Sequence, residues 1–255
     1  MLPEKPLFII GTGRSGTTLL FRLLANHPDL AWPCIGHTPL PEPYDLWTKA
    51  GFHCFSRPCR DLRGIDAVPE QNRMEIQQSF AHFCEQANRT RFLTKYTGWP
   101  RLEFVRRIFP DARFIHLMRD GRAVAWSLMQ QPWWHGWQGP TQWRWGQLSP
   151  EDQQIWEESD RSFYVLAGLQ WKVLMDSIMA SSALHPVLHL KYERLVASPE
   201  IVLSEICRFA ELPTKKFGGE PLKSANHKWR SIDTSEQAAF NKHLGPVLCH
   251  YGYNL

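Results

Sequence analysis

The stretch Leu7-Phe-Ile-Ile-Gly11-Thr-Gly-Arg-Ser-Gly-Thr-Thr18 decides the fold of this chain. Its four apolar residues predict a buried strand, and the segment from Ser15 to Asn26 has leucines at helical spacing. A glycine-rich turn between a strand and a helix lets backbone N–H groups approach an anion, and the helix N-terminus adds partial positive charge. We therefore expect this turn to hold a phosphate or sulfate group.

The same turn lacks the lysine of a nucleoside-triphosphate loop. The spacing Gly11-x-x-x-x-Gly16 resembles such a loop, but Thr17 stands at the lysine position. This substitution argues against a nucleotide kinase or an ATPase. Arg14 instead offers a planar set of donors that can bind two oxygens of an anion at once.

Outward from the turn, short apolar runs alternate with longer segments of helical period, a pattern typical of crossover units on a parallel sheet. This predicts the α/β class: a three-layer, P-loop-like domain with a mainly parallel central sheet and helices on both faces. Two stretches, at about 32–69 and 132–150, break the pattern and are interpreted as insertions in a single domain over residues 1–255. Further strands are predicted at 91–95, 112–118 and 187–190, and helices at 72–88, 100–109, 121–130, 199–211 and 236–253.

Composition narrows the function classes. The 255 residues carry a net charge of +4, which suits an anionic ligand, but the charges are spread along the chain, so no nucleic-acid partner is expected. No segment approaches the roughly 20 apolar residues of a membrane span. The six cysteines have neither paired spacing nor a histidine pattern for zinc. We expect a soluble, cytoplasmic protein with free thiols and no metal.

A second motif, Phe114-Ile-His-Leu-Met-Arg119-Asp-Gly-Arg-Ala-Val-Ala-Trp-Ser127, lies where a predicted strand ends and a helix begins. Alone, its Arg-Asp pair would be an ordinary surface ion pair. Together with the first loop and Asn26-His-Pro-Asp29, it resembles the superfamily of sulfotransferases that use 3′-phosphoadenosine 5′-phosphosulfate (PAPS). The resemblance is to the Arg-Ser-Gly-Thr-Thr branch, which includes tyrosylprotein sulfotransferases and many bacterial enzymes. It extends over nearly the whole chain, the two insertions excepted.

The resemblance implies which residues bind PAPS. Arg119 and Ser127 would hold the 3′-phosphate, which a charged donor and a hydroxyl can satisfy jointly. Tyr192, in Lys191-Tyr-Glu-Arg-Leu-Val, would contact the nucleotide, while Arg122 is left open between the cofactor and a solvated face. The implied 5′-phosphosulfate site is Arg14, Ser15, Gly16, Thr17 and Thr18, and the loop that closes over PAPS would contribute Lys228, Trp229 and Arg230, with packing an equal interpretation for Trp229.

Transfer needs a base for the acceptor proton and cations for the leaving group. The resemblance assigns the cationic role to Arg14 and to Lys95, in Arg91-Phe-Leu-Thr-Lys95. The base stays open, because this chain has no carboxylate where tyrosylprotein sulfotransferases have Gly-Glu-Glu after His-Pro-Asp. Either Glu42 enters through a longer loop, or His37 acts as histidine does in the cytosolic branch. Asp45 and His135 rank behind these two.

The acceptor is expected to be a hydroxyl of a small molecule, a carbohydrate or a lipid. Five tryptophans between 132 and 150 either pack internally or wall an acceptor cleft. Two other functions remain as alternatives: a non-catalytic domain that binds PAPS or its desulfated product, and, with less support, a P-loop nucleotide kinase. The sequence does not predict an oligomeric state.

Overall fold

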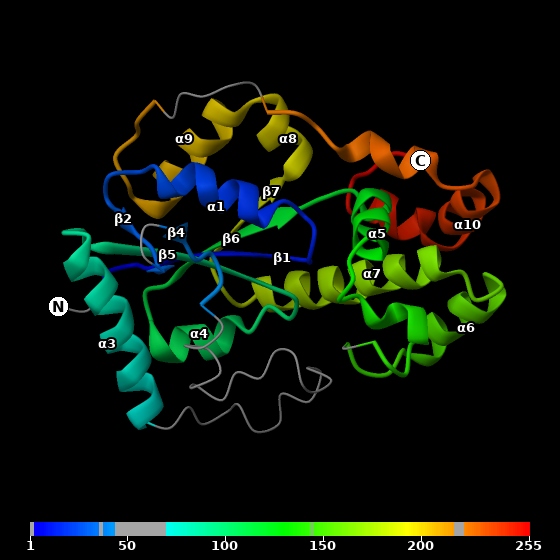
Figure 1. Ribbon diagram of the computed structural model, residues 1–255, viewed down its shortest axis with the longest axis horizontal. Coiled ribbons are helices and arrows are strands. Elements are labelled where there is room, and N and C mark those ends of the chain that lie inside the picture. The colour runs from blue at the N-terminus through cyan, green and yellow to red at the C-terminus, as the bar shows by residue number, and fades with distance from the viewer. Residues whose placement is uncertain (1–2, 36–37, 44–69, 144, 217–221) are drawn as a thin grey trace.

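The computed structural model describes residues 3–35, 38–43, 70–143, 145–216 and 222–255. Its centre is a five-stranded, all-parallel sheet in the order β2-β5-β1-β6-β7 (Figure 1). This sheet with helices on both faces confirms the predicted fold class. The strands are β1 (Leu7–Gly11), β2 (Leu30–Ala31), β5 (Arg91–Thr97), β6 (Arg113–Met118) and β7 (Val187–Lys191). A separate antiparallel pair joins β3 (Cys34–Ile35) to β4 (Thr38–Pro39).

Alternation along the central strand builds two separate cores. Leu7 and Ile9 of β1 face α1 (Thr17–Ala25), α8 (Tyr192–Ala197) and α9 (Pro199–Ala210). Phe8 and Ile10 face the opposite side, against α3 (Glu70–Gln86) and α4 (Leu102–Ile108). Successive side chains of a strand point to opposite faces, so a wholly apolar strand must be covered on both. Figure 1 shows these two helical layers above and below the sheet.

A third core gathers around α7 (Phe163–Ser182), a helix of 20 residues. Trp171, Leu166 and Leu174 are fully buried, while Ile178 reaches the core below the sheet. The sequence-based assignment places no element between 150 and 187, where the structure has α6 (Pro150–Glu158) and α7. A helix covered on most sides has no single apolar stripe to reveal it. Around α7 pack α5 (Gly121–Met129) and α10 (Thr234–His250).

The predicted elements otherwise lie close to the observed ones, and β5 continues to Thr97, two residues beyond its expected end. Parallel strands end at a common edge of the sheet, so the residues that follow β1, β5, β6 and β7 come together there. None of the helices in the described ranges is both long and apolar enough to cross a membrane. The described cysteines, Cys34, Cys84, Cys207 and Cys249, are free thiols.

Candidate functional site

The loop between β1 and α1 is a tight turn that requires glycine at position 16. Gly16 has a φ of 95°, and a Cβ there would lie 2.5 Å from the ring of Tyr192, the first residue of α8. The Ser15 hydroxyl is buried and donates to the Thr12 carbonyl at 2.7 Å. Arg14, with a φ of 71°, is exposed beside it. The turn thus places Arg14 at the surface, directly before the first residues of α1.

This geometry predicts the effect of adding one methyl group at Gly16. We expect Gly16→Ala to lower the free energy of unfolding by about 1–3 kcal/mol, because alanine is strained at positive φ and displaces Tyr192. Gly13→Ala is the matched control, since its Cβ would meet only Leu128, at 3.9 Å. Urea denaturation of both variants tests this, and equal losses would show that the contact with Tyr192 is unimportant.

Arg119, at the end of β6, lies against the same turn. Its Nη1 donates to the Arg14 carbonyl at 2.9 Å, and its guanidinium stacks over the Tyr192 ring at 4.4 Å. Arg14 Nε in turn donates to Ser127 Oγ at 3.0 Å. Burial lowers the pKa of Arg119 from its ordinary value, which reflects the cost of holding a charge away from water. The structure therefore brings Arg14, Arg119 and Ser127 together, as an anion site requires.

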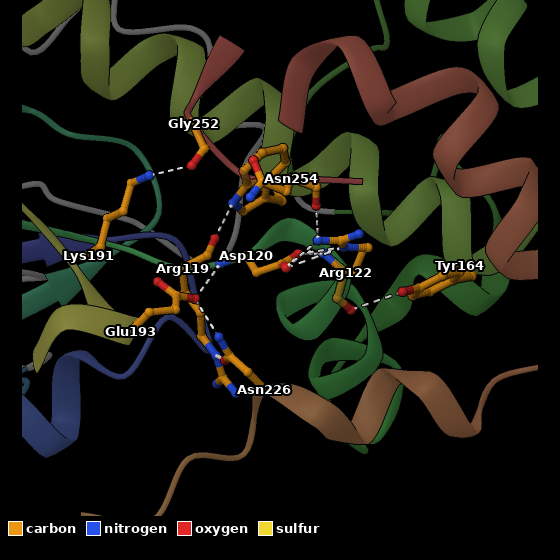
Figure 2. Close-up of polar contacts among 10 residues, drawn as sticks. Arg119, Asp120, Arg122, Tyr164, Lys191, Glu193, Asn226, Gly252 and Asn254 are labelled. Carbon is orange, nitrogen blue, oxygen red and sulfur yellow. Dashed lines mark hydrogen bonds and ion pairs between the residues drawn. The ribbon is translucent and has the colours of Figure 1, made fainter. Parts of the chain in front are cut away.

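Arg122 is engaged elsewhere (Figure 2). Its guanidinium pairs with Asp120 at 2.7 Å and donates to the carbonyl of Asn254 at 2.6 Å. It also stacks on Trp229 at 4.6 Å. Asp120 accepts the backbone N–H of Arg122 and so caps α5. These contacts link Arg122 to the C-terminal segment and place the Trp229 ring against its guanidinium.

At the end of β5, Lys95 meets a carboxylate. Lys95 Nζ lies 2.8 Å from Glu42 Oε2, and Thr97 Oγ1 donates to Glu42 Oε1 at 3.2 Å. The segment before Glu42 is held along the strand, because the Lys95 N–H donates to the Pro41 carbonyl at 3.0 Å. Burial lowers the pKa of Lys95, the pairing with Glu42 opposes that shift, and the nearby charge of Arg14 adds to it.

The candidates for the catalytic base differ in where the structure places them. Glu42 does enter through the loop and reaches Lys95. His37 and Asp45 lie outside the described residues. His135 lies in the short helix η1 (His135–Gln138), which packs against α7.

The tryptophan-rich stretch has two parts with different environments. Trp134 and Trp143 are buried, and Trp134 donates to Gln170 Oε1 at 2.8 Å, so these two are packing residues. Trp145 covers Gly98, where an added Cβ would lie 2.8 Å from its ring. Because Gly98 directly follows Thr97, one indole of this stretch borders the end of β5. Trp133 and Trp137 are each nearly half exposed.

The expected closing loop is the short helix η2 (Asn226–Ser231), with Lys228 and Arg230 both exposed. Its contact with the site comes from a residue that the motif reading did not single out. Asn226 Oδ1 accepts from Arg119 Nε at 2.8 Å, and its Nδ2 donates to Glu193 Oε1. Both residues belong to motifs of the sequence, Asn226 two positions before Lys228 and Glu193 directly after Tyr192, but the motifs gave neither of them a role. Asn226 is 33 residues from Glu193 and 107 residues from Arg119, so these pairings leave no pattern in the local sequence.

Comparison with known proteins gives independent evidence on the family to which this chain belongs. The family described as "Sulfotransferase family" matches residues 6–216, which leaves η2 outside the matched range. The nodulation protein NoeE of Sinorhizobium fredii is 28% identical over 137 residues, 48% of this chain and 30% of that protein. A putative protein-tyrosine sulfotransferase of Caenorhabditis briggsae is 31% identical over 131 residues, 50% of this chain and 44% of the relative. The matches therefore span less than half the length of these two relatives.

Solved structures show a similar fold over the whole chain. A sulfotransferase domain from the curacin biosynthetic pathway has a TM-score of 0.58 and 17% identity, covering 100% of this chain and 99% of that domain. The sulfotransferase domain of the Synechococcus olefin synthase has a TM-score of 0.51 and 21% identity, covering 100% of this chain and 96% of the other. At these identities the likeness concerns the arrangement of helices and strands.

Proposed function

The chain belongs to the sulfotransferase family, whose members use PAPS, and from that premise we propose that it transfers a sulfuryl group from PAPS to a hydroxyl acceptor by in-line displacement. The observation that carries the proposal is the pairing of Glu42 with Lys95 at the edge of the sheet where Arg14, Arg119 and Ser127 also meet. A site that only bound the nucleotide would not need a carboxylate held by two donors beside a buried cation. This favours an enzyme over a non-catalytic binding domain.

The residues present fit a ligand with two anionic ends. Around the β1–α1 turn, backbone N–H groups, Arg14 and Thr18 are available to the 5′-phosphosulfate. Arg119 and Ser127 supply a charged donor and a hydroxyl for the 3′-phosphate. Ser15 and Thr17 are buried, so we assign them to the shape of the turn and its backbone donors. With Thr17 buried at the position of the P-loop lysine, a nucleotide kinase has little support.

When bound, PAPS supplies an activated sulfuryl group: the acceptor oxygen bonds to sulfur, the bond from sulfur to the 5′-phosphate oxygen breaks, and the acceptor proton passes to a base. We assign the base to Glu42, whose two oxygens are held by Lys95 and Thr97. Proton uptake by Glu42 removes the negative partner of Lys95. The charge of Lys95 is then uncompensated as negative charge develops on the leaving group, which Lys95 and Arg14 stabilise.

The acceptor is proposed to enter from the side of Trp145, which borders the end of β5 next to Thr97. An indole face suits the ring of a sugar, an aryl group or an acyl chain. The acceptor class therefore stays broad: a hydroxyl of a small molecule, a carbohydrate or a lipid.

Calorimetric titration with adenosine 3′,5′-bisphosphate (PAP), the desulfated product, tests the nucleotide site. We expect PAP to bind at least tenfold more tightly than ATP with magnesium, because Arg119 and Ser127 have no 3′-phosphate to bind in ATP. Tighter binding of ATP with magnesium would place the chain with phosphoryl-transfer enzymes and overturn the proposal.

A further inference from the structure

We propose that Asn226 sets the preference of this site for a nucleotide that carries a 3′-phosphate, by orienting Arg119 without neutralising it. The inference rests on the proposed PAPS site and deepens it. Asn226 is a positioning residue here, since it acts through the arginine.

Arg119 is held on two sides, and the amide of Asn226 provides one of them. Its Nε donates to Asn226 Oδ1 at 2.8 Å, and its Nη1 donates to the Arg14 carbonyl at 2.9 Å. Below, the ring of Tyr192 supports the guanidinium plane. In the described part of the chain, Nη2 of this arginine makes no hydrogen bond, so that donor is left for a ligand. Two fixed donors and a stacked plane leave the guanidinium one orientation.

The orientation of the amide is itself determined (Figure 2). Asn226 Nδ2 donates to Glu193 Oε1, which also accepts the backbone N–H of Asp120 at 3.1 Å. A carboxylate oxygen only accepts, so the NH2 group of Asn226 must face Glu193 and its oxygen must face Arg119. Glu193 thus fixes the amide, and the amide fixes the arginine.

A neutral residue at this place has an electrostatic consequence. Were a carboxylate in direct contact with Arg119, it would compensate the charge that a 3′-phosphate dianion has to meet. Asn226 instead stands between Glu193 and Arg119, and the other acid nearby, Asp120, is paired with Arg122. The arrangement supplies an acceptor for Nε while the positive charge of Arg119 stays available.

Titration of purified variants with two nucleotides tests this role. PAP and ADP share the adenosine and a 5′-phosphate, but ADP lacks the 3′-phosphate and carries a second phosphate at the 5′ end, where PAPS carries its sulfuryl group. We expect Asn226→Ala to lower the affinity for PAP by about tenfold and Asn226→Asp by more, with ADP affinity within about twofold of wild type for both. His227→Ala, an exposed neighbour in η2, is the matched control and should change neither affinity.

Each outcome decides the matter. Equal losses for PAP and ADP would show that Asn226 serves only the folding of η2, and unchanged PAP affinity would show that Arg119 needs no orientation; either overturns the inference. An Asn226→Asp variant that binds PAP better than Asn226→Ala would overturn the electrostatic argument. Failure of the wild-type protein to prefer PAP over ADP would instead refute the proposed PAPS site, and this inference with it. Circular dichroism melting shows whether each variant is folded.

Discussion

Replacing Glu42 with glutamine is expected to lower kcat by about 10²–10⁴-fold while the affinity for PAP stays within about twofold of wild type. Glutamine has nearly the same shape and can still accept from Thr97, so the loop should keep its place beside β5. It cannot take up the acceptor proton. The loss should therefore appear in the chemical step and not in nucleotide binding.

The measurement is release of PAP from PAPS in the presence of a panel of hydroxyl acceptors: an aryl alcohol, a monosaccharide and a hydroxy fatty acid. The kcat of each variant is then measured with the acceptor that the wild-type protein uses. Glu103→Gln is the matched control, because Glu103 also pairs with a cation, Arg107, but on the exposed face of α4. A Glu42→Gln variant that keeps at least half of wild-type kcat would exclude Glu42 as the base and make His37 the next candidate, ahead of Asp45 and His135.

Arg119→Ala is expected to weaken PAP binding by about 10–150-fold, the equivalent of the roughly 1.5–3 kcal/mol that hydrogen bonds to charged groups contribute. The effect should be large because this arginine is mostly buried and joins the turn after β1 to the end of β6. Affinity for ADP should fall much less, since the lost contact is to the 3′-phosphate. Lysine at this position should restore little of the lost affinity for PAP, because lysine lacks the planar set of donors.

Calorimetry with PAP and ADP measures both affinities. Arg113→Ala is the matched control: it lies at the opposite end of the same strand, where it pairs with Glu211. If Arg119→Ala binds PAP as wild type does, the 3′-phosphate site lies elsewhere. A loss of the same size for PAP and ADP would mean that Arg119 supports the turn after β1 and not the phosphate.

Local patterns were enough to predict four of the five strands of the sheet, β1, β5, β6 and β7, whereas the two-residue strand β2 was not predicted. The apolar run at 7–10, the glycine turn and the helix behind it form a strand–turn–helix unit whose residues are all neighbours in sequence. Arg119 and Ser127 were assigned by the resemblance of their motif to the sulfotransferase family, and in the structure one directly follows β6 while the other lies two turns along α5. The strand–turn–helix unit can be read directly because its geometry depends on short-range backbone rules.

The long helix α7 was not predicted from local patterns. It is apolar on most sides because three cores meet around it, and a periodic stripe appears only when one face of a helix meets water. Arg122 is a different case: its neighbours in sequence left its role open, and in the structure it donates to the carbonyl of Asn254, 132 residues away.

By itself, then, the sequence predicted the α/β class and the glycine turn between β1 and α1, because each depends on residues a few positions apart, while the roles of Arg14 and Arg119 came from the resemblance to the family. The tertiary structure alone decided that Glu42 meets Lys95 and that Asn226 meets Arg119. Those pairs are 53 and 107 residues apart. Which side chains meet at the edge of a parallel sheet depends on strand order and on the path of the loops, and neither is encoded in any local period.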